Sequence, residues 1–369
     1  MPVDLAQRRE FYKQIEEYRK RPLIVYATST RAGVNAMMAA DVVREFVDQV
    51  NAVPDGAAVD VLIHSTGGDP LTAWKLMSLL RERFTDVSVL VPYMAFSAAT
   101  IFSLGADQIF MHPHASLGPI DPQIQMRQAD GTVRVFAYED VGAFLRFLES
   151  DVQISEQAHI SSVVERLFQV ADPLNIGAAK RASELSADIG ERLLHMHMKG
   201  EDDNGRARQI AENLNKAFFA HGDAVSRGRA KELQLKIADS DPALEKLMWQ
   251  AYSGLESLME LRRPFSPLQV FLADPSAAAT LQPIAPVPLP ANAPLGVAQQ
   301  VWGAVVNQLV QNAANGAVQV SYELIAAVCE STRCASEARA KGTISAWYQA
   351  PGEVKVNIVE SESGWRKVD

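Results

Sequence analysis

The chain has 369 residues, of which 48% are hydrophobic and 21% are charged, and its formal net charge is −9. The mild acidity and the lack of any Lys/Arg block argue against nucleic acid or an anionic membrane surface as a partner, because both require clustered positive charge. No apolar run reaches the roughly 18 residues that a transmembrane helix needs, and the charged N-terminus lacks the apolar core of a signal peptide. We therefore expect a cytoplasmic protein of one sizeable α/β domain and a smaller one.

Helical and strand-like patterns alternate through the first third of the chain. Residues 5–20 are charged and weakly periodic, which predicts an amphipathic helix. Strands are then predicted at 22–28, 58–63, 87–91 and 107–112, and helices at 35–50, 70–84 and 97–105. This alternation predicts a mostly parallel sheet with right-handed crossovers and flanking helices.

The second half of the chain changes character twice. Residues from about 140 to 235 are mainly helical, with breaks at Asp172-Pro173 and at 200–206. Eight prolines between 264 and 294 predict an extended linker. Beyond it, helical runs at 297–314 and 322–340 and short strands at 343–349 and 353–359 predict a small α+β module.

We therefore expect an N-terminal helix at 1–21, a main domain at 22–263, a Pro/Ala-rich linker at 264–294 and a small C-terminal module at 295–369. Deletion from about residue 295 should then leave a soluble, folded core.

Ser97 lies at a position that favours nucleophilic chemistry. It follows the strand at 87–91 across a short connection and opens an apolar helix, where free N–H groups and the helix dipole stabilise negative charge. Upstream, Gly67 and Gly68 follow the strand at 58–63 and precede Asp69-Pro70, a typical helix start. Glycine amides in such a turn approach a substrate closely and form half of an oxyanion hole.

Three segments carry a family resemblance: "STGGDP" at 65–70, "MAFSAATIFSLGADQIFMHPHASLGPIDPQ" at 94–123, and "HGDAVSRGRAKELQLKI" at 221–237. Their order and spacing resemble the serine dehydrogenase proteinase family, whose relatives are the Clp protease proteolytic subunit and signal peptide peptidase A. The resemblance covers roughly residues 20 to 240.

The resemblance implies a Clp/crotonase-like α/β fold and a serine endopeptidase without a cofactor. Ser97 would form an acyl-enzyme, and Gly67, Gly68 and Ala98 would form the oxyanion hole. It also implies a peptide or protein substrate and a homo-oligomer, for which the N-terminal helix is a plausible assembly element. An unfoldase partner is left open.

The general base is not settled by the sequence. The Clp subunit carries its histidine close to the position of Asp121, so its Ser-His-Asp order does not transfer. A permuted triad would use His221 as the base and Asp121 to orient it, with Asp223 as an alternative to Asp121. The alternative base is Lys180, as in the Ser-Lys dyad of signal peptide peptidase A, although Lys180 lies opposite the apolar stripe of its helix and is expected to be solvated.

The remaining candidates have structural interpretations. His195 and His197 diverge by about 200° on a helix, so they are not expected to bind one metal ion. His112 and His114 are expected to make local hydrogen bonds, His64 to support the glycine turn, and Ser103 to bond its own helix. Cys329 and Cys334, expected on the helix at 322–340, are too few for a disulfide framework and have no zinc complement.

Two other functions remain open. A crotonase-type acyl-CoA enzyme shares the fold and the glycine turn but needs no serine at 97. A catalytically silent scaffold, acting through its C-terminal module, accounts for the missing histidine.

Overall fold

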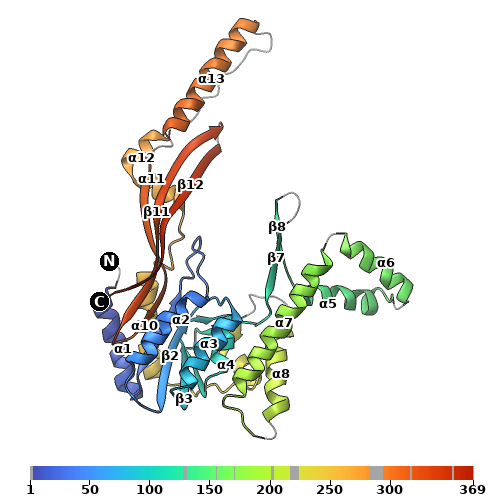
Figure 1. Cartoon of the computed structure of the whole chain (residues 1–369), viewed down its shortest axis with the longest axis vertical. Helices are drawn as coiled ribbons and strands as arrows, with labels where there is room; N and C mark the ends of the chain where they lie inside the picture. The colour runs from blue at the N-terminus through green and yellow to red at the C-terminus, as the bar shows by residue number, and fades with distance from the viewer. Residues whose placement is uncertain are drawn as a thin grey trace.

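The computed structural model describes residues 3–127, 131–154, 156–169, 171–200, 203–216, 224–281, 294–315, 318–350 and 353–368. Its main feature is a seven-stranded sheet in the order β12-β11-β10-β1-β2-β3-β5. The strands β1 (Leu23–Thr28), β2 (Ala58–His64), β3 (Asp86–Val91) and β5 (Gln108–Met111) are parallel. The predicted α/β fold with a parallel sheet and flanking helices is confirmed (Figure 1).

Helices cover both faces of the parallel strands. On one face, α2 (Val43–Ala52), α3 (Pro70–Arg81) and α4 (Ala98–Leu104) pack in one apolar cluster with the alternate strand residues Val59, Val61 and Ile63. On the other face, α1 (Leu5–Arg19) and α10 (Pro242–Leu258) pack with Leu62 and Leu90. Burial on both faces explains the nearly continuous apolar runs of these strands.

Among the first four helices of this body, α1 and α3 begin at a residue whose side chain caps them, whereas α2 and α4 have no such cap. Asp4 caps α1 in a capping box with Gln7, and Asp69 accepts hydrogen bonds from the N–H groups of Leu71 and Thr72 at the start of α3. The helix predicted at 35–50 begins later, because α2 starts at Val43 after a short 3-10 turn, η1 (Ala40–Val42).

Small strands and a helical projection follow the parallel body. The strands β4 (Met94–Ala95), β6 (Ser116–Leu117) and β9 (Val225–Ser226) form a separate three-stranded sheet, and β7 (Gln123–Arg127) pairs with β8 (Val133–Ala137). The helices are α5 (Tyr138–Arg146), the π-helical turn η2 (Phe147–Asp151), α6 (Gln157–Phe168), α7 (Pro173–Leu194), α8 (Asp203–Lys216) and α9 (Arg227–Glu232). The break predicted at Asp172-Pro173 is confirmed, because Asp172 caps α7 and Pro173 is its first residue. The helices α5 and α6 project away from the body (Figure 1).

The helix predicted at 322–340 is wrong. These residues form β10 (Val320–Glu330) and the start of β11 (Ala335–Ala350), and β12 (Glu353–Lys367) follows. β10 pairs antiparallel with β1, β11 with β10, and β12 with β11. The backbone N–H and C=O groups at the edge of β1 need hydrogen-bond partners, and β10 supplies them. This pairing between segments distant in the sequence overrides the helical pattern of residues 322–340. The strands predicted at 343–349 and 353–359 are confirmed as parts of β11 and β12.

The predicted linker is not wholly extended. It contains α11 (Pro267–Ala273) and α12 (Pro275–Thr280), in which each proline occupies the first turn after a capping residue, Ser266 or Asp274. Proline fits this position because its missing N–H has no helical acceptor there. Residues 282–293 of the predicted linker lie outside the described residues. The helical run predicted at 297–314 is confirmed by α13 (Leu295–Asn315).

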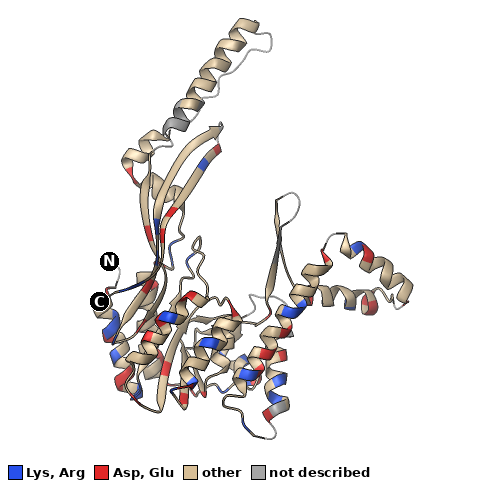
Figure 2. Cartoon of the chain, viewed as in Figure 1, with Lys and Arg blue, Asp and Glu red and all other residues tan. Residues whose placement is uncertain are grey.

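The C-terminal strands continue beyond the body as an arm that carries α11, α12 and α13 (Figure 1). Its own small core contains Phe271, Ala277, Ile344 and Ala346. Figure 2 shows no Lys, Arg, Asp or Glu along the described part of α13. None of the helices in the described ranges combines the length and apolar character needed to cross a bilayer. The division at 263 and 295 stays a prediction, while the central sheet runs across it.

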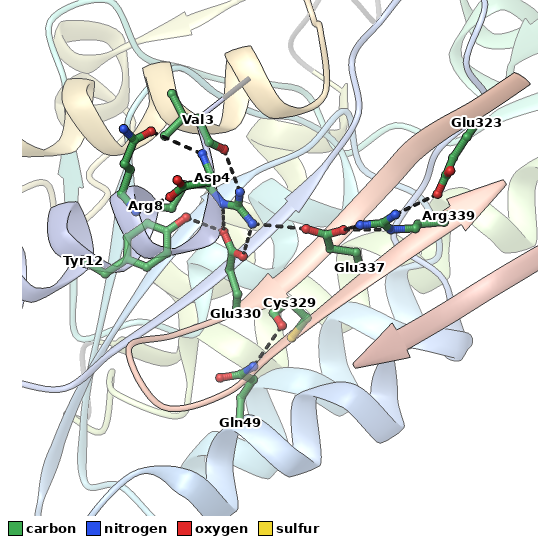
Figure 3. A network of polar contacts seen from close by, with 11 residues as sticks. Val3, Asp4, Arg8, Tyr12, Gln49, Glu323, Cys329, Glu330, Glu337 and Arg339 are labelled. Carbon is green, nitrogen blue, oxygen red and sulfur yellow. Dashed lines mark hydrogen bonds and ion pairs between the residues drawn. The ribbon is translucent and has the colours of Figure 1, made fainter. Parts of the chain in front are cut away.

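A buried network of ion pairs and hydrogen bonds connects α1 to the hairpin of β10 and β11 (Figure 3). The guanidinium of Arg8 donates to both carboxylate oxygens of Glu330 at 2.9 Å and to Glu337 at 3.2 Å. The hydroxyl of Tyr12 donates to Glu330 at 2.5 Å. Arg8 and Glu330 are 1% and 0% exposed, so each charge depends on the other for compensation.

Candidate active site

Ser97 occupies the N-cap position of α4 in an unusual backbone conformation. Its φ is 50° and its ψ is −117°, outside the regions that L-residues commonly adopt, and its side chain makes no capping hydrogen bond. All seven residues of α4 are buried, which holds this conformation in place. Strain of this kind is concentrated at functional sites.

The glycine turn packs directly against Ser97. Gly67 has a φ of 102°, and a Cβ there would lie 2.5 Å from the carbonyl oxygen of Phe96 and 2.6 Å from the Cβ of Ser97. Gly68 has a φ of 148°, and a Cβ there would overlap the backbone of Met38. Both positions therefore require glycine for conformation and for space.

A hydrogen-bonded frame joins the turn to the segment before Ser97. The hydroxyl of Ser65 accepts hydrogen bonds from the N–H of Gly67 at 3.0 Å and from the hydroxyl of Thr28 at 2.7 Å. The Ser65 N–H donates to Met94 O at 3.0 Å, and the Phe96 N–H donates to Ser65 O at 2.9 Å. The sequence pattern identified Ser65 only as a turn residue and gave no signal for Thr28.

The hydrogen bonds of this frame determine which backbone N–H groups remain free to bind a substrate oxygen. The N–H of Gly67 already donates to Ser65, so Gly67 acts here through its lack of a side chain. In the described part of the chain, no acceptor takes a hydrogen bond from the N–H of Gly68 or of Ala98. Two free N–H donors beside a strained serine can stabilise an oxyanion.

Asp121 lies on a segment that runs beside the Ser97 segment. β6 pairs with β4, and the Gly118 N–H donates to the hydroxyl of Thr100 in α4 at 3.0 Å. Asp121 follows four residues after β6 and is half-buried. His221 and Asp223 lie outside the described residues. The chain is described again from residue 224, and β9 pairs antiparallel with β6.

Lys180 lies on α7 in an exposed setting. Its ammonium group is 3.8 Å from a carboxylate oxygen of Glu184, and the Lys180 side chain is 54% exposed. The burial that would make a lysine a base near neutral pH is not present at this position.

The other histidines make local contacts. His197 Nε2 lies 2.9 Å from Leu104 O, and His195 Nδ1 lies 3.4 Å from Met198 O. His112 accepts a hydrogen bond from the His114 N–H at 3.1 Å. His64 is fully buried, and burial lowers the pKa of its imidazole to about 4.

Ser103 donates to Ala99 O in its own helix, as expected. Cys329 is in β10 and Cys334 in the following turn, not on a helix, and both thiols are free. Within the described part, no three His, Cys, Asp or Glu side chains gather as a metal site would require.

Comparisons with known proteins identify the family of the chain. The sequence model of the ClpP-like SDH-type serine proteinases matches residues 5–254. Two uncharacterised proteins of Methanocaldococcus jannaschii are 35% and 23% identical over 198 residues, covering 54% of this chain and 59% and 58% of theirs. The chain thus spans less than two thirds of the length of these relatives.

Solved structures similar to the chain include two proteases. The 1510-N membrane-bound stomatin-specific protease aligns over 62% of this chain and 84% of its own, with 14% identity and a TM-score of 0.36. ClpP1 from Listeria monocytogenes aligns over 63% and 97%, with 13% identity and a TM-score of 0.32.

Proposed function

The chain belongs to the family of ClpP-like SDH-type serine proteinases, and from this premise we propose that it is a serine endopeptidase that forms an acyl-enzyme at Ser97. The observation that carries the proposal is the strained Ser97 backbone, packed against Gly67 and flanked by two free amides. A capping serine would need none of these features.

In the proposed reaction, the Ser97 oxygen attacks a peptide carbonyl while a base takes the hydroxyl proton. The N–H groups of Gly68 and Ala98 hold the oxyanion of the tetrahedral intermediate. The base returns its proton to the leaving amine as the peptide bond breaks. Water then hydrolyses the ester and releases the second product.

We propose His221 as the base and Asp121 as its orienting carboxylate. The support is topological: β6 lies between β4 and β9 in the three-stranded sheet. β4 precedes Ser97, β6 precedes Asp121 and β9 follows His221, so the pairing of these strands brings the three segments together. Lys180 is the alternative base, and its exposure beside Glu184 argues against it.

The substrate class, assembly and location are part of the same proposal. A peptide or protein substrate follows from the chemistry, and a homo-oligomer would shield the sites. A cytoplasmic location rests on the two free cysteines, which are typical of a reducing compartment.

A fluorophosphonate probe tests the central claim, because it labels only an activated serine. We expect the full chain to be labelled and to hydrolyse unstructured peptides, Ser97→Ala to lose both properties, and Ser103→Ala to keep both. Absence of labelling in the wild type would favour the silent scaffold or the crotonase-type enzyme, neither of which needs an activated Ser97.

The base is tested by pH and by matched variants. With His221 as base, activity should rise with pH through a value near the ordinary histidine pKa of about 6.5, and His221→Ala should abolish it while Lys180→Ala does not. The reverse pattern would assign Lys180. In a working triad, Asp121→Asn should lower the rate by orders of magnitude.

A further inference from the structure

A pocket of about 580 Å³ opens near the carboxyl ends of two sheet strands. Thr30 follows β1 by two residues and Tyr93 follows β3 by two, and both line the pocket opposite residues of α10. Met94, whose carbonyl accepts a hydrogen bond from Ser65 in the frame of the Ser97 site, also lines this pocket, whereas Ser97, Gly68 and Ala98 do not. Ligands of open α/β sheets commonly bind at the carboxyl ends of the strands.

One wall of this pocket is aromatic. The ring centroids of Tyr93 and Tyr252 lie 5.1 Å apart, and those of Trp249 and Tyr252 lie 5.2 Å apart. Trp249 is also stacked on His112, at 5.0 Å and 22°. The wall is therefore fixed by mutual packing before any ligand arrives, which lowers the entropy cost of binding.

A buried histidine contacts two of the residues that line the pocket. The ring of His64 is 5.0 Å from that of Tyr252, and its Nε2 is 3.3 Å from the hydroxyl of Thr30 in the pocket. His64 is 0% exposed. An imidazole buried in this way holds Thr30 and Tyr252 in position.

Two opposite charges also line the pocket. Glu256, on α10, is half-buried, and Arg262, after α10, is exposed. Within the described part of the chain, neither side chain forms an ion pair, whereas the neighbouring Glu260 is paired with Arg31. A carboxylate and a guanidinium beside one aromatic wall match the chemistry of a zwitterion with an aromatic ring.

We propose that this pocket binds an aromatic amino acid or a short peptide with an aromatic residue. The ring lies against Tyr93, Trp249 and Tyr252, the ammonium group pairs with Glu256, and the carboxylate pairs with Arg262. The volume falls in the range of pockets for small molecules. The proposal does not depend on chemistry at Ser97.

Calorimetric titration of the full-length chain tests each part of the ligand. We use Ser97→Ala as the host so that hydrolysis of a peptide probe does not interfere. L-Phenylalanine should bind more than about tenfold more tightly than L-leucine, which lacks the ring. N-Acetyl-L-phenylalanine, without the ammonium group, and L-phenylalaninamide, without the carboxylate, should each lose about tenfold or more. L-Leucyl-L-phenylalanine distinguishes a peptide ligand from a free amino acid.

Variants of the two charges identify their roles. Glu256→Gln should abolish the preference for L-phenylalanine over its N-acetyl derivative and keep the preference over the amide. Arg262→Gln should show the opposite pattern. Arg263→Gln, an exposed neighbour that does not line the pocket, should change neither preference.

The proposal is overturned if neither L-phenylalanine nor the dipeptide binds at about 10 mM to the folded host. It is also overturned if Glu256→Gln and Arg262→Gln leave both preferences unchanged. Failure of Ser97 labelling would leave this binding experiment unaffected, so the two proposals fail separately.

Discussion

At the scale of single residues, the proposed active site depends on backbone conformations that only the surrounding packing maintains. A non-glycine residue with the φ of Ser97 costs about 1 to 3 kcal/mol, and the buried helix α4 offsets that cost. Gly67 and Gly68 adopt positive φ values at the point where the turn meets Ser97. The site is therefore sensitive to any atom added at the turn.

Gly67→Ala should reduce fluorophosphonate labelling of Ser97 by about a hundredfold or more, because the new Cβ would collide with Phe96 O and displace the Ser97 side chain. Gly228→Ala is the matched control, since its Cβ would have no neighbour within 4 Å. Both labelling rates are measured on protein whose fold is checked by circular dichroism. A normal rate in Gly67→Ala would show that the turn does not shape the site.

His64 should make stability depend on pH below neutrality. Burial lowers its folded-state pKa to about 4, whereas the unfolded value is near 6.5, so the unfolded chain binds the proton first. The contribution of the neutral His64 to the free energy of unfolding is complete above about pH 6.5 and is lost as the pH falls towards 4. Between pH 7 and pH 5 the free energy of unfolding should fall by about 2 kcal/mol because of this histidine.

Urea denaturation at these two pH values measures the effect. His197, whose pKa burial also lowers to about 4, adds a similar loss, so the wild type should lose more than one histidine accounts for. His64→Gln should show a loss smaller by about 2 kcal/mol. An unchanged pH dependence in His64→Gln would mean that the imidazole already titrates normally in the folded protein.

At the scale of elements, the buried network of Arg8, Tyr12, Glu330 and Glu337 joins the first helix to a hairpin more than 300 positions later in the chain (Figure 3). Such a network is a weak source of net stability but a strong penalty when broken. The network connects α1 with both strands of the hairpin, β10 and β11.

Glu330→Gln should lower the free energy of unfolding by about 3 kcal/mol, because Arg8 would keep its burial and lose the nearer of its two carboxylate partners, leaving only Glu337, which Arg339 shares. Glu17→Gln is the control, since the pair of Glu17 with Lys13 is exposed and should contribute little. Urea denaturation compares the two. Equal effects would show that water reaches Arg8 in the folded state.

The elements also show what the sequence can predict. The strands at 23–28, 58–64 and 86–91 are short apolar runs between helix caps, so local patterns suffice to identify them. The segment at 322–340 mixes apolar and polar residues in a pattern that is compatible with a helix, and its pairing with β1 decides that it is a hairpin. For the candidate site, the local motifs alone point to Ser97 and the two glycines, and the structure places Gly67 against Ser97, whereas the Ser65–Thr28 frame depends on contacts between distant strands.

At the scale of the whole molecule, the arm grows out of the body because β10 to β12 extend the central sheet (Figure 1). Within the arm, Leu281 and Val318 both pack against the cluster formed by Phe271, Ala277, Ile344 and Ala346. Residues 281 and 318 therefore both lie at this one cluster. The part of the arm that includes α13 should be removable without interrupting the sheet.

Replacing residues 282–317 by a short Gly/Ser linker should leave a soluble protein that unfolds cooperatively, because every sheet strand and the Arg8–Glu330 network remain. Truncation after residue 294, by contrast, should give insoluble or strongly destabilised protein, since it leaves the edge of β1 unpaired and Arg8 without its carboxylates. Composition alone predicts the opposite result for the truncation, a soluble core, so soluble yield and urea denaturation of the two variants decide between them. If the truncated chain is soluble and cooperative while the linker variant aggregates, then the C-terminal strands are dispensable to the body and the sheet pairing contributes little to its stability.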